Sequence, residues 1–196
     1  MGRTSMREQR RARQRRQQTL RRLLWAAGGL VVLVAVGWLA SQAFRPGVGQ
    51  SVETSPAGQH VPEGTDPGEY STDPPTSGVH FPSTFDAGFY APGDAASLPS
   101  FPAAYLVHNL EHGYVIYWYN CGDLAPEACS RLQSSIQDSM REAGSVKLIA
   151  FPWESISEQV VLTSWGKILR LETFDPDQAE DFIRANRYRA PEPNGA

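Results

Sequence analysis

Sulfur-containing and imidazole side chains are both scarce in this chain. Its 196 residues include two cysteines, Cys121 and Cys129, and three methionines, two of which lie within the first six residues. A copper(I) carrier that uses thioether ligands needs more methionines than this, so the composition argues against that class. The four histidines all lie between His60 and His112, and none follows. Such confinement is typical of a ligand set for a metal of intermediate softness.

Charged side chains are absent from residues 23–44, a run of 22 residues. As a helix this run is roughly 33 Å long, enough to cross a hydrocarbon core about 30 Å thick. Trp25 and Trp38 lie near its ends, where aromatic rings favour the membrane interface. The run is longer than the apolar region of about 7–15 residues that a cleaved signal peptide has, although the small residues at 41–43 leave cleavage as the alternative. We therefore predict an uncleaved, single-pass transmembrane helix.

The charges on either side of this run predict its orientation. Residues 1–22 contain nine arginines, no lysine and one acid, whereas Arg45 is the only charge immediately after the run. Positive charge is retained in the cytoplasm, so we predict a cytoplasmic N-terminus and an extracytoplasmic C-terminal domain at the cell membrane. From residue 46 onward, 8 lysines and arginines stand against 20 aspartates and glutamates, a net charge of −12. Such an acidic domain disfavours nucleic acid as a partner.

The extracytoplasmic part is predicted to consist of a linker and one domain. Residues 45–58 are rich in glycine, proline and serine without apolar periodicity, which is typical of a linker. Residues 59–193 are long enough for a single hydrophobic core. Within them, residues 61–102 contain many prolines and glycines but also regular aromatics, which favours an ordered segment rich in loops.

Regular secondary structure is predicted from residue 105 onward. Residues rich in β-branched and aromatic side chains predict strands at 114–120, 145–152, 159–166 and 167–174. Pro126 and Gly144 mark the start and end of one predicted helix, and a last helix begins at Pro176. This order predicts an α+β domain with a mostly antiparallel sheet and two helices packed on it.

Cys121 and Cys129 lie in the part of the chain that we place outside the cytoplasm, where a disulfide bond is the default. A bond between them closes a short ring, which stabilises the fold by about 2.6 kcal/mol on a loop-entropy estimate. A pair of reactive thiols or of metal ligands is the alternative.

The segment His108–Asn109–Leu110–Glu111–His112 has the order of an inverted zinc-peptidase motif. That motif needs a long helix, which directs both histidines to one metal and the glutamate to a water molecule. Here Pro102 and Gly113 leave room for at most about two turns of helix, so we disfavour a peptidase. We expect instead a short turn before the strand at 114–120, with both histidines pointing the same way.

A site for copper or zinc is one interpretation of the histidines. The stiff segment Pro74–Gly78 fixes the position of His80, and a fixed position suits a metal ligand. The predicted ligands are His80, His108 and His112, with His60 as an optional fourth and Glu111 as a ligand or as the orienter of an imidazole. The alternative is that these side chains are structural and bond backbone groups in a core rich in loops.

Five segments of the chain carry a family resemblance. They are PPTSGVHFP at 74–82, GFY at 88–90, LVHNLEHGYVIYWY at 106–119, LTSWG at 162–166 and NRYRAPEP at 186–193. In this combination the chain resembles the DUF3105 proteins, an uncharacterised bacterial family whose members commonly have an N-terminal membrane anchor. The resemblance implies no established activity, but it implies that the histidine-bearing loops are the family's signature.

Together these features predict a membrane-anchored, extracytoplasmic domain that binds copper or zinc through clustered histidines. The alternative is a non-catalytic interaction module, such as an accessory subunit of a membrane complex, with structural histidines. No distinctive serine–histidine–acid spacing is present, so a hydrolase ranks behind both, and we favour a role without enzymatic activity.

Overall fold

The computed structural model of the chain describes residues 25, 28–30, 32, 34, 48–95 and 97–195. The chain divides into two units, Met1–Pro46 and Gly47–Ala196, and the second contains the sheet. The predicted arginine-rich segment 1–22 lies outside the described residues, as does most of the predicted membrane span 23–44. Within the described part of the chain, no helix is long and apolar enough to cross a membrane.

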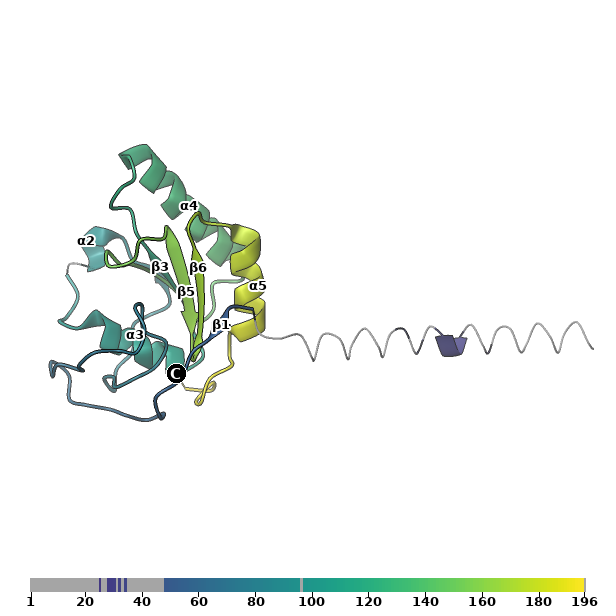
Figure 1. The fold of residues 1–196 in the computed structure, drawn as a ribbon, viewed down its shortest axis with the longest axis horizontal. Coiled ribbons are helices and arrows are strands. Elements are labelled where there is room, and N and C mark those ends of the chain that lie inside the picture. The colour runs from purple at the N-terminus through teal and green to yellow at the C-terminus, as the bar shows by residue number, and fades with distance from the viewer. Residues whose placement is uncertain are drawn as a thin grey trace, which may run out of the picture. The chain divides into compact units, whose positions relative to one another are not determined.

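A six-stranded sheet with the order β1-β6-β5-β3-β4-β2 forms the centre of the second unit (Figure 1). The strands are β1 (Gln50–Ser51), β2 (Gly88–Phe89), β3 (Val115–Tyr119), β4 (Leu148–Pro152), β5 (Val160–Ser164) and β6 (Lys167–Leu171). Three ladders, β1–β6, β6–β5 and β5–β3, are antiparallel, whereas β3–β4 and β4–β2 are parallel.

The α+β class is confirmed, and the four predicted strands are β3, β4, β5 and β6. The sheet is mixed, however, where the prediction had it mostly antiparallel. The reason is helix α4 (Pro126–Glu142), which crosses back between β3 and β4 and leaves these neighbours parallel. The short strand β1 lies within the predicted linker and pairs with β6.

Helices α4 and α5 (Pro176–Asn186) confirm the two predicted helices. Each begins with proline, which the first turn tolerates because the N–H groups there have no partner within the helix. The Asp175 side chain caps α5 by accepting hydrogen bonds from the N–H groups of Asp177 and Gln178. A short helix, α2 (Pro92–Ala95), lies in the segment rich in loops.

Helix α3 (Pro102–Glu111) is longer than predicted, with ten residues where at most two turns were expected. Every residue from Ala103 to Glu111 is buried, so the segment lacks the polar face that normally identifies a helix in a sequence. The expectation of a short turn at His108 was therefore wrong, because His108 lies in the last turn of a regular helix.

Two hydrophobic cores cover the two faces of the sheet. Along β3, Val115, Tyr117 and Tyr119 pack in the core that includes residues of α4 and α5. Ile116 and Trp118 point the other way, into the core that includes α3 and the segment rich in loops. All five residues are buried, and the unit has three layers: α4 with α5, the sheet, and α3 with the loops (Figure 1).

The predicted disulfide is confirmed. Cys121 and Cys129 are bonded, with an S–S distance of 2.08 Å, and no free cysteine remains in the chain. The bond ties the residues just after β3 to the first turn of α4.

Candidate metal centre

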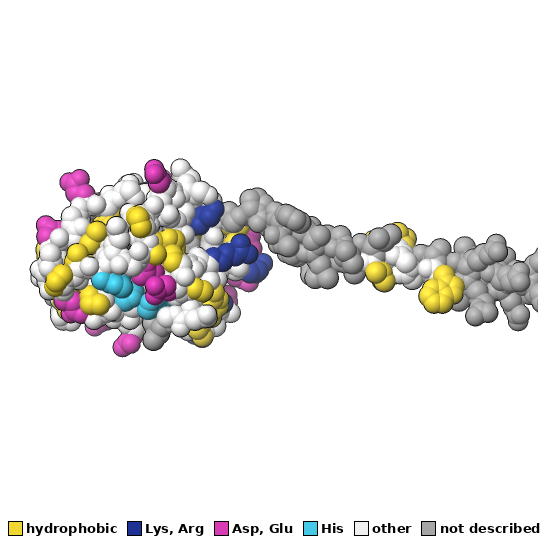
Figure 2. Space-filling view, turned by 90° about the horizontal axis from the view of Figure 1, so that it is seen from below, with side chains coloured by type: hydrophobic (Ala, Val, Ile, Leu, Met, Phe, Trp, Pro, Cys, Tyr) yellow, Lys and Arg dark blue, Asp and Glu magenta, His cyan; other side chains and the backbone are white. Residues whose placement is uncertain are grey.

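Four side chains that could hold a metal ion converge beside α3. They are His60, His80, His108 and Glu111, and their potential ligand atoms all lie within 4.8 Å of one another. The ring centroids of the three histidines are 4.7–5.1 Å apart. Figure 2 shows that histidine side chains gather on one face of the molecule, next to acidic and hydrophobic side chains.

Backbone pairing brings His60 and His80 together. The two residues form an isolated parallel bridge, in which the N–H of Val61 donates to the carbonyl of His80 at 2.9 Å. Gly78 has a φ of +141°, and a Cβ there would lie 2.7 Å from the ring of Tyr70. The predicted rigidity of the loop before His80 thus has a structural basis, since only glycine fits at this position.

Helix α3 supplies the other two members of the group. His108 and Glu111 are three residues apart, so they lie on the same face of the helix. His112 is the C-cap residue that directly follows α3, and its N–H donates to the carbonyls of His108 and Asn109, both at 3.1 Å.

Glu111 lies at the centre of the polar contacts. Its side chain is fully buried, and Oε1 accepts a hydrogen bond from the N–H of Gly58 at 2.6 Å. Oε2 lies 3.0 Å from Nε2 of His80 and 3.9 Å from Nε2 of His60. Among the residues that the structure describes, no lysine or arginine forms an ion pair with this carboxylate.

The tautomer of His80 follows from its other nitrogen. Nδ1 lies 2.7 Å from the carbonyl oxygen of Gly78, which can only accept, so Nδ1 donates this hydrogen bond. In the neutral ring, Nε2 therefore carries a lone pair, and that lone pair faces Oε2 of Glu111. Nε2 either carries a second proton, which it donates to Oε2, or binds a cation next to it.

His108 has one engaged nitrogen and one without a hydrogen-bond partner. Its Nε2 lies 3.1 Å from Nε2 of His112, whereas the buried Nδ1 has no partner. Burial, followed by the nearby rings of His112, His80 and His60, lowers the pKa of His108 to about 4, against an opposing effect of Glu111. The ring is therefore neutral at physiological pH, as a metal ligand must be.

The structure brings together most of the predicted site. His80, His108 and Glu111 are buried in the group, and His60, which was ranked as optional, belongs to it with 41% of its side chain exposed. His112 lies outside the four-residue group and instead contacts His108. The contacts made by the backbone groups of Gly58 and Gly78 were not predicted, because a main-chain N–H or carbonyl can make such a contact whatever the residue type.

These features define an α+β domain with a buried group of histidines and one carboxylate. The chain matches the family described as "Protein of unknown function (DUF3105)" over residues 60–196, and it belongs to this family. The match begins at His60 and so includes the whole group. No curated protein and no solved structure matches the chain.

Proposed function

We propose that the domain binds a divalent transition-metal ion, Zn(II) or Cu(II), through His60, His80, His108 and Glu111. Imidazole nitrogens suit both metals, and the group contains no thiolate or thioether that would favour Cu(I). The observation that carries the proposal is the convergence of three imidazoles and a buried carboxylate from separate segments of the chain on one point.

The contact between His80 and Glu111 supports a bound cation. Nδ1 of His80 donates to Gly78, so Nε2 of a ring with a single proton and Oε2 of a carboxylate without one would both be acceptors, and they lie 3.0 Å apart. Two lone pairs at this distance repel each other unless a proton or a metal ion satisfies both. A metal ion in contact with both atoms removes the repulsion and leaves the hydrogen bond to Gly78 in place.

The unpartnered Nδ1 of His108 supports the same proposal. Buried polar atoms in native proteins almost always have a partner, and a metal ion provides one here. Because Nε2 of His108 is already engaged by His112, Nδ1 is the nitrogen that remains for a ligand role.

Glu111 also needs a positive partner. A fully buried carboxylate is costly to desolvate, and in the described part of the chain its ion-pair partners are the rings of His60 and His80 alone. A divalent cation offsets this cost more strongly than the backbone N–H of Gly58 does.

The spacing suits a small ion after modest contraction. Tetrahedral ligands about 2.0–2.1 Å from zinc lie about 3.4 Å from one another. The widest pair of ligand atoms in the group is within 4.8 Å, so it has to close by about 1.4 Å at most. His60 can make this movement, because it is the only member of the group with a substantially exposed side chain.

We further propose that the chain presents this domain outside the cytoplasm from an N-terminal membrane anchor. The disulfide supports an oxidising compartment. The described residues of the predicted span are helical, and the side chains of Trp25, Leu30, Val32 and Val34 are 61–79% exposed. Apolar side chains so exposed suit contact with lipid.

The test is a titration of the purified full chain, stripped of metal by a chelator, with Zn(II) and Cu(II) in competition with a chromophoric chelator. We expect one ion per chain. His60→Ala should lower the affinity by about 100-fold or more, since loss of a mere supporting partner of a ligand already costs about 10–100-fold. Because 41% of the His60 side chain is exposed, this change should leave the fold intact.

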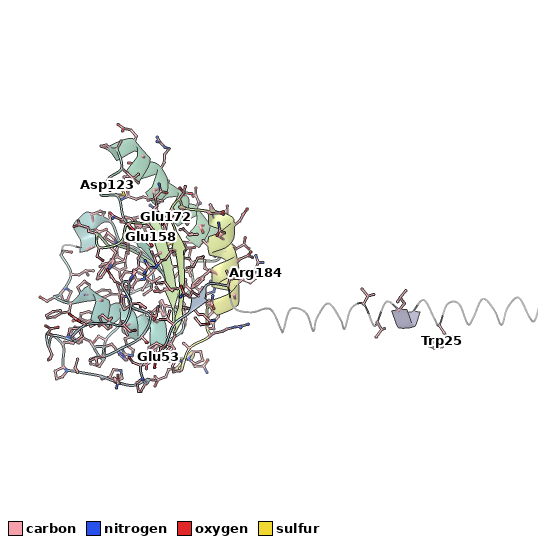
Figure 3. All side chains as sticks on the ribbon, in the orientation of Figure 1. Trp25, Glu53, Asp123, Glu158, Glu172 and Arg184 are labelled. Atoms are coloured by element: carbon pink, nitrogen blue, oxygen red, sulfur yellow. A yellow bond between two sulfur atoms is a disulfide. The ribbon has the colours of Figure 1, made fainter. Side chains whose placement is uncertain are left out.

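Glu111→Gln provides the second variant, and Glu158→Gln provides its matched control. Glu158, which is labelled in Figure 3, is also a buried carboxylate, but it pairs with Arg170 and is not one of the four residues of the group. Glu111→Gln should lose metal while Glu158→Gln retains it. Equal, weak binding by the wild type and all three variants would contradict the proposal, and the histidines would then be structural parts of an interaction module.

A further inference from the structure

We propose that His112 and the C-terminal segment, defined as Glu192–Gly195, are positioning parts of the metal centre. This inference rests on the proposed function. In the proposed arrangement, His112 orients the ring of His108 so that Nδ1 faces the metal. The C-terminal segment in turn holds His112 in place.

The contact between the two rings sets the orientation of His108. Their Nε2 atoms are 3.1 Å apart and their centroids 4.4 Å apart. If His108 binds metal through Nδ1, its proton sits on Nε2, which donates to the lone pair on Nε2 of His112. Metal-binding histidines usually donate their second N–H to a fixed acceptor, and His112 is that acceptor for His108. His80 has the equivalent arrangement with the carbonyl of Gly78.

The C-terminal segment packs directly against the ring of His112. A Cβ at Gly195 would lie 2.5–2.6 Å from Cδ2, Nε2 and Cε1 of that ring, so the backbone approaches as closely as a glycine allows. The N–H of Glu192 donates to the carbonyl of Glu111 at 3.0 Å. Oε2 of Glu192 lies 3.7 Å from Nε2 of His112.

Lys147 joins the C-terminal segment to the end of α3. Its Nζ donates to the carbonyl of His112 at 2.7 Å and to the carbonyls of Pro193 and Gly195, both at 3.0 Å. A lysine side chain close to the C-terminal end of a helix can satisfy the last carbonyls in this way. Lys147 has a φ of +51°, a conformation that costs free energy in a residue with a Cβ. Its three hydrogen bonds offset that cost.

The test combines four substitutions in the full chain with Zn(II) affinity and the Cu(II) electron paramagnetic resonance spectrum. His112→Phe keeps an aromatic ring but removes the acceptor, so we expect affinity to fall by about 10–100-fold and the Cu(II) hyperfine coupling to change. His112→Gln restores an acceptor and should recover most of the affinity. Gly195→Ala and Lys147→Met should weaken binding by about 3–10-fold, because they displace the C-terminal segment without removing a ligand.

Matched controls separate positioning from general damage to the fold. A Cβ at Gly93 meets nothing within 4 Å, so Gly93→Ala controls for Gly195→Ala. Lys167 donates to the Ser51 hydroxyl, so Lys167→Met controls for Lys147→Met. Both controls should bind metal as the wild type does. If the wild type binds metal and His112→Phe and Gly195→Ala bind it equally well with unchanged spectra, this inference fails alone. If the wild type binds none, the proposed function fails with it.

Discussion

His80 and Glu111 face each other with Nε2 and Oε2 3.0 Å apart, and both side chains are fully buried. Each is held from behind by a backbone group, the carbonyl of Gly78 for His80 and the N–H of Gly58 for Glu111. The arrangement therefore fixes a ring nitrogen and a carboxylate oxygen side by side in a place that water does not screen, where a proton or a metal ion between them stabilises both. Such a pair has a strong preference for a cation.

Metal should therefore stabilise the fold. With Zn(II) at about 100 times its Kd, the free energy of unfolding should rise by about 2.7 kcal/mol, which shifts Tm upward by about 5–10 °C for a unit of this size. The measurement is thermal unfolding of the full chain with and without Zn(II). Glu111→Gln should abolish the shift and Glu158→Gln should retain it. A wild-type Tm that does not respond to metal would count against the proposed site.

The disulfide should stabilise the fold without tuning the metal centre. Replacing both Cys121 and Cys129 by serine should lower the free energy of unfolding by about 2.6 kcal/mol, because the short ring no longer restricts the unfolded chain. The disulfide lies just after the C-terminal end of β3, whereas α3 precedes the N-terminal end of that strand. Metal affinity should thus change by less than about threefold, within the range expected for independent sites. Urea unfolding and the Zn(II) titration check the two parts, and a large loss of affinity would show that the sites are coupled.

Much of the fold could be predicted because several elements have one buried and one exposed face. Leu132, Ile136 and Met140 recur on one side of α4, and these three residues are buried. The parallel pairing of β3 with β4 could not be read in the same way. It depends on the direction in which α4 returns the chain, which is a property of the packed domain and not of any local pattern.

The same distinction applies to the site. His80, His108 and Glu111 could be predicted as members of the candidate site from their residue types and from their confinement to one stretch of the chain. The place of His60 depends on the isolated bridge that it forms with His80, a contact across 20 residues that has no local signal. His112 was predicted as a ligand from its spacing to His108. The helix ends at Glu111, and the ring of His112 contacts both His108 and the C-terminal segment.

Asn109 should prove important for the stability of the layer that carries the site. Its fully buried side chain accepts a hydrogen bond from the N–H of Phe85 at 3.0 Å and donates one to the carbonyl of Phe85 at 2.9 Å. Asn109→Ala leaves both backbone groups without these partners, so the free energy of unfolding should fall by about 2–4 kcal/mol. Urea denaturation measures this loss. A change below about 0.5 kcal/mol, as at an ordinary surface position, would contradict the role of this side chain.

The metal-free domain should become less stable in acid because of His108. Its pKa in the folded state is lowered from 6.5 to about 4, chiefly by burial and then by the neighbouring histidines. Between these pH values the unfolded chain binds a proton at this residue that the folded chain does not. The free energy of unfolding is therefore fully maintained above pH 6.5 and decreases as the pH falls towards 4, by about 3 kcal/mol in all.

Urea unfolding of the full chain in the presence of a chelator, at about pH 7.5, 5.5 and 4.5, measures this loss. His108→Gln replaces the titrating ring with a neutral side chain, so its stability should fall less steeply than that of the wild type over the same interval. Above about pH 7 the two stability curves should run parallel, because His108 is neutral there in both the folded and the unfolded chain. Equal slopes for the wild type and His108→Gln between pH 6.5 and 4 would mean that His108 titrates normally in the folded domain. The case for a neutral, buried ligand at this position would then be lost.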